Sequence, residues 1–138
     1  MAPGDGQVVT LDTNVAIYAF SDNEQKAPAA FDALARSTFV SVQLLNEFAN
    51  VLVRKRRLPW PQVREMLDEL RTAIKFVLPL DDTIHRDALR LAERYRLSLY
   101  DALMVSAALS GGAQTLHSED MQHGLLIDDT LRIVDPFR

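Results

Sequence analysis

The chain has 138 residues, 48% of them hydrophobic, and a formal net charge of −4 at pH 7. This length fits one domain covering residues 1–138, and the apolar content is enough for a packed core, so the composition excludes a globally disordered protein. The absence of cysteine excludes a disulfide framework, thiolate zinc sites and a cysteine nucleophile, and it fits a reducing, cytoplasmic location.

The first third of the chain predicts a strand followed by two helices. The β-branched, apolar segment Gln7–Leu11 is typical of a buried strand. Asn14–Phe20 predicts a short helix capped by Thr13 or Asn14. After a turn, Glu24–Arg36 predicts a longer helix, and its expected buried side consists of Ala27, Ala30, Phe31 and Leu34.

The middle of the chain predicts two helices between two short strands, Thr38–Val40 and Phe76–Leu78. The first helix, Gln43–Arg56, carries apolar side chains at helical spacing, namely Leu44, Phe48, Val51 and Leu52. The proline-containing segment Pro59–Pro61 ends this helix and starts the next, Gln62–Lys75.

The last third predicts two more helices and two strands. Thr83–Tyr95 is amphipathic, whereas Ser98–Ser110 is apolar almost all round, so we expect the second helix to be buried centrally. Gly111–Gly112 ends it and is a helix stop rather than a phosphate loop. The strands are Ala113–Leu116 and Leu131–Val134.

Alternating strands and helices predict an α/β fold with a mainly parallel sheet and helices on both faces. Such sheets bind ligands at the carboxyl ends of their strands. Asp12 directly follows the first strand, and Asp120 follows the Ala113–Leu116 strand by a few residues. We therefore expect both carboxylates at the same edge of the sheet.

Four acidic residues, Asp12, Glu47, Asp101 and Asp120, lie within or at the end of apolar runs. Burying a carboxylate costs several kcal/mol unless something compensates its charge. Four such costs suggest one shared partner, and Mg²⁺ or Mn²⁺ suits carboxylate oxygens best. The pattern therefore favours metal-assisted hydrolysis of phosphodiesters.

The first two acids also have ordinary structural interpretations. Asp12 precedes Thr13 and Asn14, and all three types of side chain cap helix N-termini. Glu47 lies three residues after Leu44, on the apolar stripe of its helix, where it could pair with an arginine instead of a metal.

The other two acids have structural alternatives as well. Ser98 and Asp101 are spaced as in a capping box, which is compatible with metal binding because different carboxylate oxygens can serve each purpose. Ser118 could cap a short helix, which would make Glu119 and Asp120 first-turn acids that favour the helix dipole.

Taken together, the segments Leu11–Val15, Ser41–Phe48, Leu99–Leu103 and Leu116–Gly124 resemble the PIN domain, and more closely the VapC-like toxins of bacterial type II toxin–antitoxin pairs. The resemblance covers nearly the whole chain, in order. It implies a Rossmann-like, three-layer α/β/α sandwich and a Mg²⁺- or Mn²⁺-dependent endoribonuclease. It also implies a homodimer and inhibition by a cognate antitoxin bound over the active-site groove.

Carried over by position, the resemblance assigns the acidic quartet that holds the metal and catalyses the reaction to Asp12, Glu47, Asp101 and Asp120. It assigns a supporting role to Asn14 and Ser118, which would orient the carboxylates or water. The family often has threonine at position 118, a departure that keeps the hydroxyl. His117 receives no role.

Two further features have open interpretations. Arg54, Arg56 and Arg57 belong to a basic run that could contact RNA phosphates, although cations at a helix C-terminus also complement the helix dipole. Tyr18 and Tyr100 lie near acidic positions and could stack on bases, but we expect core packing for both.

Three competing functions differ in what they require. A PIN-like nuclease acting on DNA, or in RNA processing outside a toxin–antitoxin pair, is one alternative, although a flap-type DNA nuclease usually needs more acids and extra DNA-binding segments than 138 residues leave room for. A phosphatase with an aspartyl-phosphate intermediate would need a second aspartate where the chain has Asn14, which counts against it. A non-catalytic interaction module would be marked by loss of an acid, and all four are present.

Overall fold

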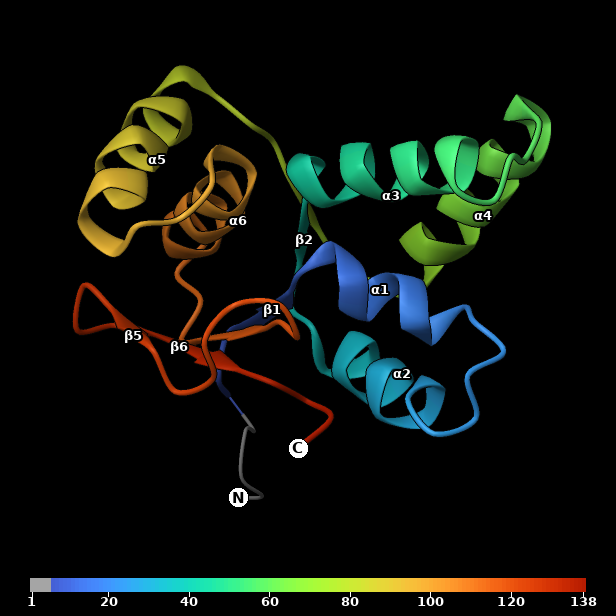
Figure 1. Cartoon of the computed structure of the whole chain (residues 1–138), viewed down its shortest axis with the longest axis horizontal. Helices are drawn as coiled ribbons and strands as arrows, with labels where there is room; N and C mark the ends of the chain where they lie inside the picture. Colours follow the sequence, from blue (N-terminus) through green and yellow to red (C-terminus); the bar gives the residue numbers. More distant parts are fainter. Residues whose placement is uncertain (1–5) are drawn as a thin grey trace.

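The computed structural model describes residues 6–138, in which helices pack around a central sheet (Figure 1). The strands are β1 (Val9–Leu11), β2 (Val40–Ser41), β3 (Val77–Leu78), β4 (Thr115–His117), β5 (Leu126–Ile127) and β6 (Leu131–Val134). The helices are α1 (Thr13–Ala19), α2 (Ala27–Arg36), α3 (Val42–Arg54), α4 (Trp60–Thr72), α5 (Asp82–Tyr95) and α6 (Leu99–Ser110).

Residues 1–5 lie outside the part of the chain that the structure describes. Among residues 6–138, no helix combines the length and the apolar character needed to cross a membrane.

Within the described residues, four strands form the main sheet in the order β1-β4-β6-β5. β1, β4 and β6 are parallel, and Leu11, His117 and Val134 stand side by side where these three strands end. β5 runs antiparallel to β6. The residues that follow β1 and β4 in the sequence therefore emerge together at one edge of the sheet, as predicted.

β2 and β3 form a separate parallel pair beside β1. The Thr38 N–H donates to the Val9 carbonyl at 2.7 Å, and the Thr10 hydroxyl donates to the Phe39 carbonyl at 2.7 Å. These bonds hold the segment leading into β2 against β1, so that α3, which starts directly after β2, begins close to the end of β1.

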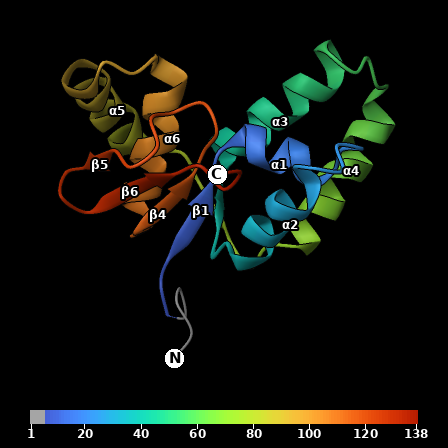
Figure 2. The same cartoon turned by 60° about the horizontal axis from the view of Figure 1, so that its bottom comes forward.

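The helices form two groups around the sheet (Figures 1 and 2). α5 and α6 pack against each other, as do α1 and α2, and α3 contacts both α1 and α6. Residues Ala102–Ala108 of α6 are all buried, which confirms the central helix expected from its apolar sequence. A mostly parallel sheet flanked by helices confirms the predicted α/β class.

Several element details differ from the sequence-based expectation. Asp12, not Thr13 or Asn14, is the N-cap of α1, because its backbone is still extended (φ −87°, ψ 163°). α2 begins only at Ala27, and its buried stripe consists of Ala30, Ala33 and Leu34, so Phe31 falls outside the stripe and is 56% exposed.

Two further details differ from the sequence-based expectation. The short antiparallel strand β5 was not predicted, because it contains only two residues and follows a turn. The expected core position of Tyr100 is also wrong, since this side chain is 63% exposed in the first turn of α6.

Candidate active site

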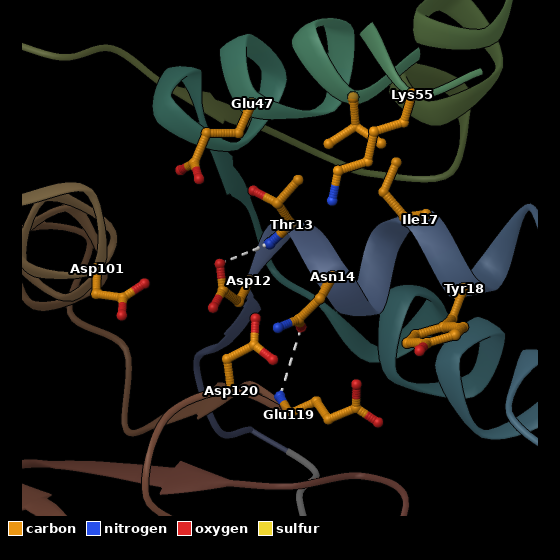
Figure 3. Close-up of a pocket in the computed structure, with 11 residues that line it drawn as sticks. Asp12, Thr13, Asn14, Ile17, Tyr18, Glu47, Lys55, Asp101, Glu119 and Asp120 are labelled. Carbon is orange, nitrogen blue, oxygen red and sulfur yellow. Dashed lines mark hydrogen bonds between the residues drawn. The ribbon is translucent and has the colours of Figure 1, made fainter. Parts of the chain in front are cut away.

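A cleft of about 400 Å³ opens at the sheet edge where β1 and β4 end, between α1, α3 and α6 (Figure 3). Its acidic part is lined by Asp12, Glu47, Asp101, Glu119 and Asp120. The rest of its wall consists of Thr13, Asn14, Ile17, Tyr18, Val51 and Lys55. All four predicted acids therefore lie in one cleft.

Asp12 is fixed at the junction of β1 and α1. Its N–H donates to the His117 carbonyl at 2.8 Å, which extends the β1–β4 pairing by one residue. Its carboxylate accepts the Thr13 N–H at Oδ1 (2.7 Å) and the Ser118 hydroxyl at Oδ2 (2.9 Å). The helix-capping interpretation is thus correct for Asp12, and it coexists with a position in the cleft.

The residue Asp12 is buried, with 5% of its surface exposed. This burial raises the pKa of its carboxyl group to about 6. The bonds from Ser118 and Thr13 act in the opposite direction, since they stabilise the charged form. The negative charges of Asp101 and Asp120 raise the pKa further.

Glu47 extends into the cleft from the middle of α3. Burial raises its pKa to about 7, a hydrogen bond from Gln43 opposes this, and the charges of Asp12 and Asp101 add to it. Gln43 Nε2 donates to Glu47 Oε2 at 3.0 Å. None of the ion pairs formed within residues 6–138 involves Glu47, so the predicted alternative of an arginine partner is wrong.

Asp101 lies in the first turn of α6, where Ser98 is the N-cap. The Asp101 N–H donates to Ser98 Oγ at 3.2 Å, which confirms half of the suggested capping box. The reciprocal bond from the Ser98 N–H is not among the hydrogen bonds found within residues 6–138. Burial raises the pKa of the Asp101 carboxyl, Ser98 opposes the shift, and the charge of Asp120 adds to it.

Asp120 belongs to the loop that follows β4. No helix forms between Ser118 and Gly124, so the interpretation of Asp120 as a first-turn acid is wrong. Ser118 Oγ instead accepts the Met121 N–H at 3.3 Å, which fixes the turn that carries Asp120.

Asn14 and Lys26 contact Glu119, the neighbour of Asp120 in the same loop. The Glu119 N–H donates to Asn14 Oδ1 at 3.4 Å, and the Glu119 carboxylate pairs with the Lys26 ammonium. Asn14 therefore contacts the loop backbone rather than a carboxylate, whereas Ser118 contacts Asp12 directly.

The four carboxylates face a common space in the cleft (Figure 3). Repulsion from another of the four carboxylates contributes to the raised pKa of Asp12, of Glu47 and of Asp101. Within residues 6–138, no three or more His, Cys, Asp or Glu side chains already stand at metal-binding spacing.

Two observations agree with an oxygen-ligated cation at this place. The charged donors that converge are all carboxylates, which is the donor set that hard divalent ions prefer. The Thr13 hydroxyl is buried beside Asp12 and has no hydrogen-bond partner among the described residues. The chemistry of the donor groups thus fits a hard divalent cation.

The predicted basic contacts lie outside the cleft. Arg54 is in the last turn of α3, where its charge complements the helix dipole, and Arg56 and Arg57 follow as exposed residues. The cleft wall instead contains Lys55, which the sequence prediction did not single out. Its spacing of eight residues from Glu47 on one helix could have indicated it.

The sequence model of the PIN domain matches residues 9–124. No curated protein sequence matches the chain. Among solved structures, a toxin–antitoxin complex from Klebsiella pneumoniae has 21% identity and a TM-score of 0.69, and the match covers 93% of this chain and 97% of that one.

Two further solved structures have the same fold. VapC20 from Mycobacterium tuberculosis, described as a sarcin-ricin loop cleaving toxin, has 19% identity and a TM-score of 0.64, covering 81% of this chain and 89% of that one. VapBC2 from Rickettsia felis, bound to a promoter DNA fragment, has 19% identity and a TM-score of 0.67, and the match covers 94% of this chain and 100% of that one.

Proposed function

The chain belongs to the PIN domain family, and from this premise we propose that it is a metal-dependent endoribonuclease, the toxin of a toxin–antitoxin pair. The observation that carries the proposal is the convergence of four acidic side chains in one cleft, none of which forms an ion pair within residues 6–138. Burial and mutual repulsion raise the pKa of Asp12 to about 6 and of Glu47 to about 7. A divalent cation would offset both effects.

Asp12, Glu47, Asp101 and Asp120 would hold Mg²⁺ or Mn²⁺. When bound, such an ion lowers the pKa of a coordinated water and offsets the negative charge that develops on the phosphate. The protein itself contributes rigidity. Ser118 and the Thr13 N–H fix the orientation of the Asp12 carboxylate.

The same reasoning applies to the other carboxylates. Gln43 holds Oε2 of Glu47, which leaves Oε1 for the cleft. The Ser98 cap sets the first turn of α6 and therefore the direction from which Asp101 enters. Holding acidic groups in place before substrate arrives reduces the reorganisation that the reaction requires.

The toxin assignment is supported by the three similar structures. One of them is described as a toxin that cleaves the sarcin-ricin loop, and the other two are toxin–antitoxin complexes. We accordingly propose an RNA substrate, a cognate antitoxin, a homodimer, a single domain over residues 1–138 and a cytoplasmic location. Arg54, Arg56 and Arg57 are proposed as outer contacts to RNA.

The test is cleavage of a mixed pool of structured RNAs with Mg²⁺, with Mn²⁺ and with EDTA. We expect the wild type to cut only with a metal, and Asp101→Asn to reduce cutting by about 100-fold or more, because a carboxylate facing the reacting phosphate is lost. Glu65→Gln, which removes an exposed negative charge on α4, is the matched control and should cut normally.

Absence of cutting by folded, antitoxin-free wild type under both metals would contradict the proposal. If single-stranded or flap DNA is cut instead, the protein is a DNA nuclease. If neither is cut, the fold serves as an interaction module.

A further inference from the structure

The cleft has a second half whose chemistry differs from that of the acids. Beyond Glu47, its wall is formed by Ile17 of α1 and by Val51 and Lys55 of α3. Glu47, Val51 and Lys55 are spaced by four residues, so they lie along one face of α3. A single helix face therefore runs from the acidic centre, across an apolar surface, to a cation.

Lys55 is available to bind a ligand. Among the described residues that line the cleft, it alone carries a positive charge. None of the ion pairs within residues 6–138 uses its ammonium group. Lys26 is by contrast held by the Glu119 carboxylate and the Tyr18 hydroxyl.

The position of Lys55 relative to the acids follows from helix geometry. Eight residues along an α-helix place its Cα about 12 Å beyond that of Glu47. Helical side chains lean toward the N-terminus of their helix, so the Lys55 side chain leans back toward the acids. Figure 3 shows its nitrogen pointing into the cleft, on the side of Thr13 and Ile17. Its backbone is held by the helical bond from the Lys55 N–H to the Val51 carbonyl at 2.9 Å.

We infer that Lys55 binds a phosphate of the RNA backbone neighbouring the one that is cut, while the connecting nucleotide lies against Ile17 and Val51. The inference rests on the proposed nuclease function and specifies the path of the substrate along α3. It also specifies the substrate class as an unpaired segment, because the nucleotide has to turn into the cleft. A phosphate cannot bind among the acids without a metal, but it can bind at Lys55 in either case.

The alternative role of Lys55 is structural. Lys55 is the C-cap of α3, where a positive charge complements the helix dipole. That role alone would make its removal lower the thermal stability of the protein and leave RNA binding unchanged. Lys75, an exposed lysine between α4 and β3, provides a control with the same charge change outside the cleft.

The experiment measures kcat/KM for a labelled single-stranded RNA over a salt series, for the wild type, Lys55→Gln, Lys55→Arg and Lys75→Gln. We expect Lys55→Gln to lower kcat/KM roughly tenfold, as for loss of one charged hydrogen bond. The variant should also reduce the slope of log kcat/KM against log salt concentration by about 0.7. This reduction should be the same for RNAs of different sequence. Lys75→Gln should keep the wild-type values, and Lys55→Arg should recover most of the kcat/KM and salt slope that Lys55→Gln loses, because it restores the positive charge.

Binding is measured separately from turnover, as the affinity for the same RNA with and without Lys55→Gln in an Asp101→Asn background. Equal affinity, together with unchanged kinetics and salt slope, would overturn the inference while leaving the nuclease proposal intact. If the wild type cuts no RNA, the proposed function fails. The binding comparison then still decides whether Lys55 contacts RNA.

Discussion

Asp12 caps a helix and also lines the acidic cleft. Its carboxylate caps α1 through the Thr13 N–H and accepts the Ser118 hydroxyl, so both oxygens already have a partner. These bonds are too weak to keep the group at an ordinary pKa, because burial outweighs them. The metal-free protein therefore carries an unfavourable negative charge at neutral pH, which is the condition that a metal ion would relieve.

The first prediction concerns the stability of the metal-free protein. Because the folded-state pKa of Asp12 is raised from 3.8 to about 6, the folded protein binds a proton more tightly than the unfolded chain. The free energy of unfolding should fall as pH rises from about 4 through 6, with a loss of roughly 3 kcal/mol from Asp12 complete by pH 8. Thermal denaturation in EDTA between pH 4.5 and 8 measures this change.

The matched variant is Asp12→Asn, which cannot titrate but can still accept the Thr13 N–H. At pH 8 in EDTA we expect its melting temperature to equal or exceed that of the wild type, and at pH 4.5 the advantage should disappear. If Asp12→Asn is less stable at every pH, capping outweighs charge repulsion at this residue, and the argument for a cation from burial fails.

The acidic residues could be predicted from the sequence, whereas their neighbours could not. A carboxylate inside an apolar run is visible in the sequence, since its burial demands compensation. Lys55 lies between Arg54 and Arg56 in the sequence, and its spacing from Glu47 indicates only that both lie on one helix face. The packing of α3 against α1 is what places Lys55 in the cleft. The pairing of Glu119 with Lys26 joins residues far apart in sequence, and no local pattern indicates it.

At the scale of the elements, the end of α6 shows how closely the layers pack. Gly111 is the C-cap of α6, and a Cβ added there would lie 2.3 to 2.9 Å from ring atoms of Phe39. Phe39 is buried, with 2% exposure, so its ring has little room to move. The neighbouring Gly112 has space around it but a positive φ of 76°.

The second prediction follows from this contrast. Gly111→Ala should lower the free energy of unfolding by about 1–3 kcal/mol, because the methyl group overpacks the interface between α6 and Phe39. Gly112→Ala should cost about 1 kcal/mol through backbone strain alone. Urea denaturation measures both.

The double variant Phe39→Leu with Gly111→Ala separates the two causes. Relative to Phe39→Leu alone, the added alanine should cost much less than it does in the wild type, because the smaller side chain frees space. An equal cost in both backgrounds would mean that the ring is not the obstacle.

Element type was predictable wherever the hydrophobic period was long. α3, α5 and α6 carry full stripes or a continuous apolar sequence, and their predicted ranges agree with the structure within two residues. β5 and the split between the β2–β3 pair and the main sheet were not predictable, since two-residue strands have no period to read. The start of α2 was misplaced because residues 24–26 form a turn before the helix.

At the scale of the whole molecule, the cleft is assembled from distant parts of the chain. Asp12 follows β1, Glu47 lies on α3, Asp101 begins α6 and Asp120 follows β4. The parallel pairing of β1 with β4 and the contacts of α3 with both α1 and α6 bring these parts together. Because the unfolded chain does not hold the four acids near one another, a metal that binds them stabilises the folded state.

The central claim is that these four carboxylates bind one divalent cation or more. The most direct measurement is anomalous diffraction from crystals of the wild type and of Asp101→Asn grown with Mn²⁺. The account predicts a strong anomalous peak in the wild type within coordination distance of at least Asp12 and Asp101, and a weakened or absent peak in the variant. The claim would be contradicted if the wild-type cleft showed no anomalous peak under saturating Mn²⁺, or if the Mn²⁺ ion were bound elsewhere on the protein.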